Sequence, residues 1–128
     1  MSFKLNKYQL EKYSRQIILK DVGALGQKKI IKKKVLIVGM GGLGCPVAEF
    51  LTRAGVGSIG LIDSDKVELS NIHRQSLYDI SDIKKPKVMA SKRKLKKINS
   101  KIKINCYKIR LDENNYKKII KNYDYIID

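Results

Sequence analysis

V-L-I-V-G-M-G-G-L-G, residues 35 to 44, decides the fold of this chain, because an apolar strand runs directly into a glycine-rich turn. Gly39, Gly41 and Gly44 follow the G-x-G-x-x-G spacing. The first glycine permits a tight turn, the second lets backbone approach a phosphate, and the third lets the next helix pack on the strand. The N–H groups that open such a helix attract anions. The stretch predicts a nucleotide phosphate site, with a plain structural turn as the alternative.

The segments on either side of the turn predict a βαβ unit of about 30 residues. We expect a strand over 34–38, a helix over 42–54 and a second strand over 58–62. The rest of the chain predicts two N-terminal helices (8–19 and 22–31), a long polar loop (63–78), a lysine-rich helix (86–99), a third strand (102–107), a short helix (114–121) and a fourth strand (124–128). Four strands make only the first part of a doubly wound sheet, so the sequence looks cut.

The charge balance is strongly basic, with 28 Lys and Arg residues against 12 Asp and Glu residues, a net charge of +16. Such a balance suits a nucleic acid, an acidic protein or a phosphorylated small molecule. No basic stretch is interleaved with the aromatic residues that stack on bases. We therefore expect the charges to spread over solvated faces and expect no nucleic-acid partner.

The cysteines and the apolar runs indicate the cellular compartment of the protein. Cys45 and Cys106 are too far apart to form a metal-ligand pair, and two cysteines make no disulfide framework, which favours a reducing cytoplasm. The start M-S-F-K-L-N-K lacks an apolar signal segment, and the apolar runs are too short to span a bilayer. We expect a soluble, untargeted, cytoplasmic protein with no membrane partner.

Polar residues follow the second predicted strand. Asp63 lies 19 residues beyond Gly44, where an acidic group hydrogen-bonds a nucleotide ribose, although it could also cap its own loop. Asn71, Arg74 and Gln75 share one loop, and Lys87 follows at the start of a predicted helix. Cations close to the phosphates favour phosphate chemistry over hydride transfer.

These segments together resemble the ThiF/MoeB/HesA adenylating enzymes, which are related to the ubiquitin-activating enzymes. The resemblance covers essentially the whole chain and rests on five motifs: K-Y-S-R-Q-I-I-L at 12–19, V-L-I-V-G-M-G-G-L-G-C-P at 35–46, A-G-V-G at 54–57, L-I-D-S-D-K-V-E-L-S-N-I-H-R-Q at 61–75 and K-P-K at 85–87. Members bind MgATP, adenylylate the C-terminal glycine of a small ubiquitin-like protein and release pyrophosphate. The resemblance implies that activity on a sulfur carrier of the ThiS or MoaD type, from the thiamine or molybdopterin pathways, by a homodimer.

The resemblance also implies the fold. We expect an α/β protein with a Rossmann-like, doubly wound, mainly parallel sheet that is incomplete at the C-terminus and carries an N-terminal helical extension. Residues 1–33 would form the N-terminal helices, and residues 34–128 a Rossmann-like ATP-binding domain truncated after its fourth strand.

Carried onto matching positions, the resemblance implies roles for individual residues. Arg15, Arg74 and Lys87 would act in catalysis, with Arg15 reaching the ATP of the neighbouring subunit. The nucleotide would be bound by Gly39, Gly41, Gly42, Gly44, Asp63, Ser70, Asn71, Ile72, His73, Arg74 and Lys87. Each cation has a simpler alternative as a solvated surface charge. His73 is better interpreted as a loop residue than as a base, and Cys45 as a small buried residue, because adenylation needs neither.

The chain departs from the family at its end. In relatives, the strand that matches 124–128 runs into a segment whose aspartate helps to hold magnesium, so we expect no metal ligand here and a magnesium-binding Asp just beyond Asp128. Zinc would be bound only in the C-terminal part that follows in relatives. The fragment alone is expected to be nearly inactive. Two alternatives stay open: an NAD-dependent oxidoreductase domain and a non-catalytic ATP-binding partner subunit.

Overall fold

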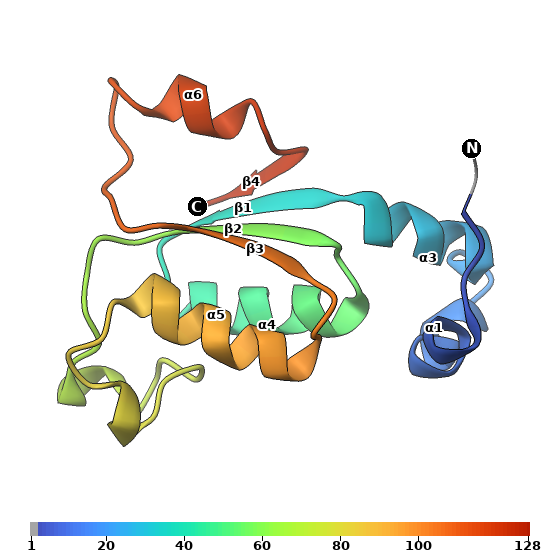
Figure 1. Cartoon of the computed structure of the whole chain (residues 1–128), viewed down its shortest axis with the longest axis horizontal. Helices are drawn as coiled ribbons and strands as arrows, with labels where there is room; N and C mark the ends of the chain where they lie inside the picture. The colour runs from blue at the N-terminus through green and yellow to red at the C-terminus, as the bar shows by residue number, and fades with distance from the viewer. Residues whose placement is uncertain (1–2) are drawn as a thin grey trace.

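The computed structural model describes residues 3–128 and has one sheet of four parallel strands in the order β3-β2-β1-β4 (Figure 1). The strands are β1 (Lys34–Val38), β2 (Ser58–Ile62), β3 (Lys103–Tyr107) and β4 (Tyr125–Ile127). Parallel neighbours require crossover connections, and helices supply them. The prediction of a Rossmann-like α/β fold is confirmed.

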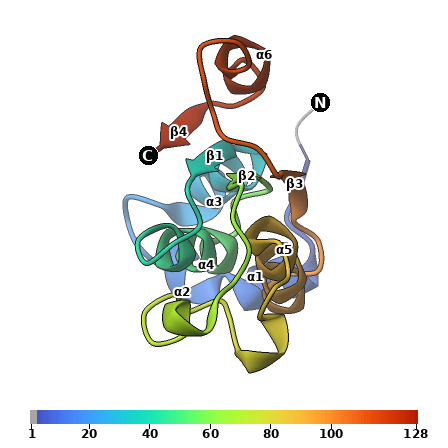
Figure 2. The same ribbon diagram turned by 90° about the vertical axis from the view of Figure 1, so that its left-hand side faces the viewer.

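Helices lie on both faces of the sheet, which makes the fold doubly wound. α4 (Gly44–Ala54) and α5 (Lys87–Ile98) cover one face, and α6 (Tyr116–Ile120) covers the other (Figures 1 and 2). β1 contributes to both sides, since Val35 and Ile37 pack in the larger apolar cluster and Leu36 packs in the smaller one with Ile119. An unbroken apolar strand is what a parallel sheet buried on both faces requires.

The N-terminal segment differs in detail from the prediction of two helices. It forms three: α1 (Lys7–Lys12), α2 (Ser14–Ile17) and α3 (Gly23–Lys32). The break falls at Tyr13, whose ring is buried and whose backbone is not helical, so the chain changes direction there. The predicted division into units at residues 33 and 34 stays a prediction.

Other boundaries move by one or two residues. The helix after the glycine turn begins at Gly44 rather than at residue 42, because the chain from Gly41 to Leu43 is still turning. The loop after β2 contains two short 3-10 helices, Leu69–Asn71 and Ile80–Asp82, which the aperiodic sequence did not reveal. Within residues 3–128, no helix has both the length and the apolar character needed to cross a bilayer.

Candidate functional site

The glycine turn lies at the carboxyl edge of the sheet, which faces the viewer in Figure 2. Gly39 has a φ of +92°, a conformation that suits glycine, and its N–H donates to the Ile62 carbonyl at 2.8 Å. A Cβ on Gly44 would lie 1.9 Å from the Gly39 carbonyl oxygen. The first and third glycines are therefore structural requirements of the turn, as the motif predicts.

Asp63 follows β2 and holds the turn. One carboxylate oxygen accepts the Met40 N–H at 2.8 Å, and the other accepts the Asp65 N–H at 2.8 Å. Asp63 therefore caps its loop, which was one of the two alternatives. The ribose contact stays a prediction, and the carboxylate leaves room for it, since about two of its four lone-pair sites stay free for hydroxyl donors.

The loop from Leu69 to Gln75 places Arg74 against the glycine turn. Arg74 donates from Nη1 to the Ser70 carbonyl at 3.0 Å, which leaves four of its five N–H groups. Its aliphatic stem lies 3.9 Å from the position that a Cβ on Gly42 would occupy. The structure thus brings Arg74 and Gly42 together, as the resemblance implied.

Other residues of this loop are positioned by their own contacts. Asn71 is buried, and its Oδ1 accepts the Glu68 N–H at 2.9 Å, so its NH2 group is the part left to donate to a ligand. His73 is exposed and its Nδ1 lies 2.9 Å from the Ser70 carbonyl. Ile72 packs its side chain against the larger apolar cluster. Ser70 itself is exposed, and its backbone carbonyl lies within hydrogen-bond distance of both the His73 and the Arg74 side chains.

Lys87 is the first residue of α5, and the loop after β2 fixes it. Its N–H donates to the Asp65 carbonyl at 3.0 Å, and the Val67 N–H donates to the Lys85 carbonyl at 2.9 Å. Lys87 as a whole is 7% exposed, and its ammonium makes no hydrogen bond or ion pair with any residue from 3 to 128. A cation whose stem is buried and whose charged end has no protein partner is available to an anion brought by a ligand.

Gln75 is a residue of this site for which the sequence analysis predicts no role. It is 4% exposed, its Oε1 has no hydrogen-bond partner within the described chain, and its Nε2 lies 3.7 Å from the position of a Cβ on Gly41. The signal in the sequence was its place directly after Arg74, but only the folded loop turns it under the glycine turn.

Arg15 lies at the opposite edge of the sheet. Its neighbour Gln16 donates to the Ala54 carbonyl at 3.0 Å, at the last residue of α4. α4 begins at the glycine turn and has 11 residues, a length of about 16 Å. The structure does not bring Arg15 to the glycine turn of its own chain, so a contact with ATP would have to be made in another subunit.

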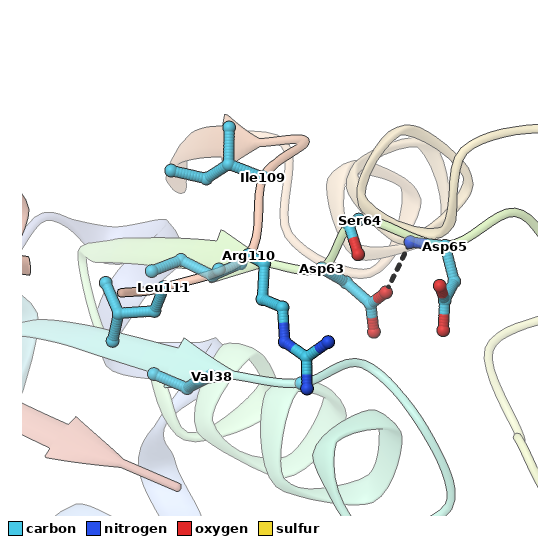
Figure 3. A pocket seen from close by; sticks show the side chains of 9 residues that line it. Val38, Asp63, Ser64, Asp65, Ile109, Arg110 and Leu111 are labelled. Atoms are coloured by element: carbon cyan, nitrogen blue, oxygen red, sulfur yellow. Dashed lines mark hydrogen bonds between the residues drawn. The ribbon is translucent and has the colours of Figure 1, made fainter. Parts of the chain in front are cut away.

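Two hollows flank the glycine turn and share Val38 and Gly39. One, of about 320 Å³, is lined on its other sides by residues 62–65 and 109–111 (Figure 3). The other, of about 330 Å³, lies over Gly41 to Gly44 and beside Ile127 and Asp128. Residues 109–111 were missed by the sequence analysis. The strand order was the missing signal, because it sets the segment after β3 beside Asp63.

The remaining reactive side chain near the turn is Cys45. It is buried at the start of α4, and burial raises the pKa of its thiol. The thiol is therefore neutral and a poor nucleophile, which supports its interpretation as a small buried residue. Within residues 3–128 there is no group of three acidic, His or Cys side chains that could hold a metal ion.

Comparisons with known proteins agree on one relationship. The ThiF family matches residues 13–128. A sulfur carrier protein adenylyltransferase of Thermus thermophilus is 40% identical over 122 residues, which cover 95% of this chain and 45% of that protein. The adenylyltransferase and sulfurtransferase MOCS3 of Culex quinquefasciatus is 43% identical over 125 residues, 98% of this chain and 28% of that protein. The chain thus spans less than half the length of these curated relatives.

Solved structures give the same result. PaaA has a TM-score of 0.89 and 33% identity, over 98% of this chain and 42% of that chain. Escherichia coli MccB, solved with ATP, has a TM-score of 0.78 and 34% identity, over 91% of this chain and 36% of that chain. This chain belongs to the ThiF family.

Proposed function

We propose that this chain is the ATP-binding part of an adenylyltransferase that acts on the C-terminal glycine of a small ubiquitin-like sulfur carrier. The observation that carries the proposal is that Arg74 lies against the glycine turn with four N–H groups free. The mostly buried Lys87 adds a second cation, close enough to Cys45 to act on its thiol and without a partner of its own within residues 3–128. Free donors gathered at a glycine turn suit the phosphates of a nucleotide. The names of the relatives from Thermus and Culex support the reaction class.

The chemistry suits these residues. The carrier's terminal carboxylate attacks the α-phosphorus, a new C–O–P bond forms, and the bond from that phosphorus to the pyrophosphate oxygen breaks. The carboxylate is already deprotonated, so no general base is required. Negative charge builds on the phosphate oxygens, where Arg74 can take two oxygens at once and Lys87 supplies a point charge. Asp63 would accept from the ribose hydroxyls and orient the nucleotide.

The other residues that the resemblance assigns to the nucleotide site would have supporting parts. Gly39, Gly41, Gly42 and Gly44 would let the phosphates approach the backbone. Ser70, Asn71, Ile72 and His73 would border the nucleotide through the loop that carries Arg74. The backbone of this loop is held by the Asn71 carbonyl, which accepts the N–H groups of Arg74 and Gln75 at 3.2 and 2.9 Å.

Arg15 would complete the site in trans, within a homodimer. Its place beyond the far end of α4 supports a contact with the other subunit's ATP rather than its own. Within residues 3–128, no three acidic, His or Cys side chains gather into a group that could hold a magnesium ion. We infer that its ligand lies beyond Asp128 and that any zinc would be bound there too. Two free cysteines suit a cytoplasmic setting.

The test is ATP-pyrophosphate exchange by the intact protein with a ThiS-type or MoaD-type carrier, read together with the mass of the carrier. The expected result is carrier-dependent exchange and a carrier that gains one AMP, while NAD gives neither exchange nor protection from heat. Protection by NAD but not by ATP would favour the oxidoreductase alternative. Binding of ATP without exchange would favour the non-catalytic subunit.

The trans role of Arg15 has its own test. Arg15→Ala and Lys87→Ala chains are each expected to be inactive alone. In a mixed dimer, the site with an intact Lys87 receives an intact Arg15 from its partner, so mixing should restore about one site in four. No recovery on mixing, with mixed dimers shown to form, would contradict the arrangement.

A further inference from the structure

Arg110 stands over the hollow beside Asp63, on the segment that follows β3. Its neighbours Ile109 and Leu111 both pack in the smaller apolar cluster beneath α6. Side chains alternate along an extended segment, so the residue between two anchored side chains faces the other way. Figure 3 shows this arrangement, with Arg110 pointing across the hollow towards Asp63 and Val38 and with Ile109 pointing away.

The backbone that carries Arg110 is braced, although its side chain is exposed. Asp112 and Asn115 exchange hydrogen bonds, from each backbone N–H to the side-chain oxygen of the other, at 2.9 and 3.0 Å. Asn115 also donates from Nδ2 to the Arg110 carbonyl at 3.0 Å. Binding through Arg110 would therefore order a side chain only, and not a loop.

The guanidinium of Arg110 is free for a ligand. It forms no hydrogen bond or ion pair with any residue in the described range, 3–128, although Asp63 and Asp65 line the same hollow. The Asp63 oxygens already accept from the Met40 and Asp65 N–H groups. The planar guanidinium of Arg110 thus stands over the hollow and has no partner among the described residues.

The lining of the hollow is mixed, with the acidic Asp63 and Asp65 on one side and the aliphatic Val38 at the end of β1. Figure 3 shows the Arg110 side chain extending towards Val38. A planar guanidinium over an aliphatic side chain suits a flat heteroaromatic ring, because Arg stacks on such rings and its charge is attracted to their faces. With a ribose at Asp63, this hollow is the adjoining space into which the base would extend.

We propose that Arg110 stacks on the purine base of the bound nucleotide and sets the affinity for the base. This inference rests on the proposed function, because it takes the ribose to lie at Asp63. Arg110 acts here through contact with the base, and makes no contact with the reacting phosphorus.

The experiment is calorimetric titration of the full chain with two probes, ATP and inorganic tripolyphosphate, for the wild type, Arg110→Ala and Arg110→Lys. Lys108→Ala is the matched control, since Lys108 is an exposed cation two residues away that does not line the hollow. Arg110→Ala is expected to weaken ATP binding about fivefold to tenfold, which is the size of a partly desolvated cation–π contact. Arg110→Lys should weaken ATP binding less than Arg110→Ala does, and Lys108→Ala should leave ATP binding unchanged.

Tripolyphosphate separates stacking on the base from attraction to the phosphates. Its binding should be unchanged by Arg110→Ala, because it carries no base. An equal loss for both probes would overturn the proposal and make Arg110 a phosphate ligand, and unchanged ATP binding would overturn it outright. If Arg110→Ala disturbs the loop, Arg110→Gln replaces it, and its melting temperature shows whether the fold is intact. Arg110→Gln should weaken ATP binding and leave tripolyphosphate binding unchanged. Failure of the wild type to bind ATP would instead contradict the proposed function.

Discussion

The two edges of the sheet treat buried polar groups in different ways. At the amino edge, Gln27 is fully buried and accepts from Gln16 at 2.7 Å while it donates to the Ala54 carbonyl at 2.9 Å. At the carboxyl edge, the Gln75 Oε1 is buried without a hydrogen-bond partner, and the ammonium of the mostly buried Lys87 also has none within residues 3–128. At the amino edge, the Thr52 hydroxyl is the one buried atom of this kind among the described residues. Groups satisfied within the chain hold the fold, whereas the unsatisfied groups at the carboxyl edge mark where a ligand is expected.

The largest expected effect separates a glycine that the fold needs from one that the ligand needs. Gly44→Ala would place a Cβ 1.9 Å from the Gly39 carbonyl oxygen, a backbone atom that cannot move away cheaply. We expect a loss of at least about 3 kcal/mol in the free energy of unfolding, measured by urea titration.

Gly41→Ala is the matched variant for that test. The nearest atom to its new Cβ would be the Gln75 Nε2 at 3.7 Å, an ordinary contact. This variant should stay folded and yet bind ATP more weakly, since the Cβ occupies the place where a phosphate approaches. Equal destabilisation by both substitutions would contradict the division of roles.

The next effect compares the two edges directly through one residue of each. Gln27→Leu removes two buried hydrogen bonds, one from Gln16 and one to the Ala54 carbonyl, and leaves the bond between Gln16 and that carbonyl in place. It should destabilise the protein by about 2 kcal/mol, since a hydrogen bond contributes about 0.5–1.5 kcal/mol. Denaturant titration gives the stability, and ATP affinity should not change in the folded fraction.

Lys87→Met is expected to do the reverse. Removal of a cation that has no partner in the chain should leave the stability unchanged or raise it by about 1 kcal/mol, because Met keeps the apolar stem, while ATP binding falls at least about tenfold. Thermal melts with and without ATP measure both quantities. A clear drop in stability without nucleotide would mean that Lys87 has a structural role after all.

The smallest expected effect concerns Asp79, in the loop before α5. Lys94 donates to its carboxylate at 2.6 Å, and this contact, with that of Ser81, lowers the pKa of Asp79 well below its ordinary value. A lowered pKa in the folded state adds stability above the unfolded pKa, and this stability disappears as the pH falls through the folded pKa. Asp79→Asn should therefore destabilise slightly at pH 7 and have less effect in strong acid, as urea titrations at both pH values would show.

The sequence predicted the fold better than it predicted the geometry of the site. β1 and β2 have the predicted bounds, because apolar runs that end in glycine or in a polar loop leave little choice of register. The break at Tyr13 escaped prediction, since it depends on burying the ring beside Asn99, a residue 86 positions away. Arg110 escaped for a similar reason, because the sheet order alone brings residues 109–111 beside Asp63.

The amino-acid sequence by itself determined the glycine turn and the parallel α/β architecture, since these depend on local spacing and apolar periodicity. Its five motifs carried the resemblance to the ThiF family, which the family match confirms. Only the tertiary structure decided which polar groups are satisfied. Gln27 and Gln75 are the same residue type, and both are buried. Gln27 meets Gln16 and Ala54, whereas the Gln75 Oε1 meets no hydrogen-bond partner within residues 3–128. A side chain's partners depend on which distant segments fold against it, and a sequence pattern does not contain that information.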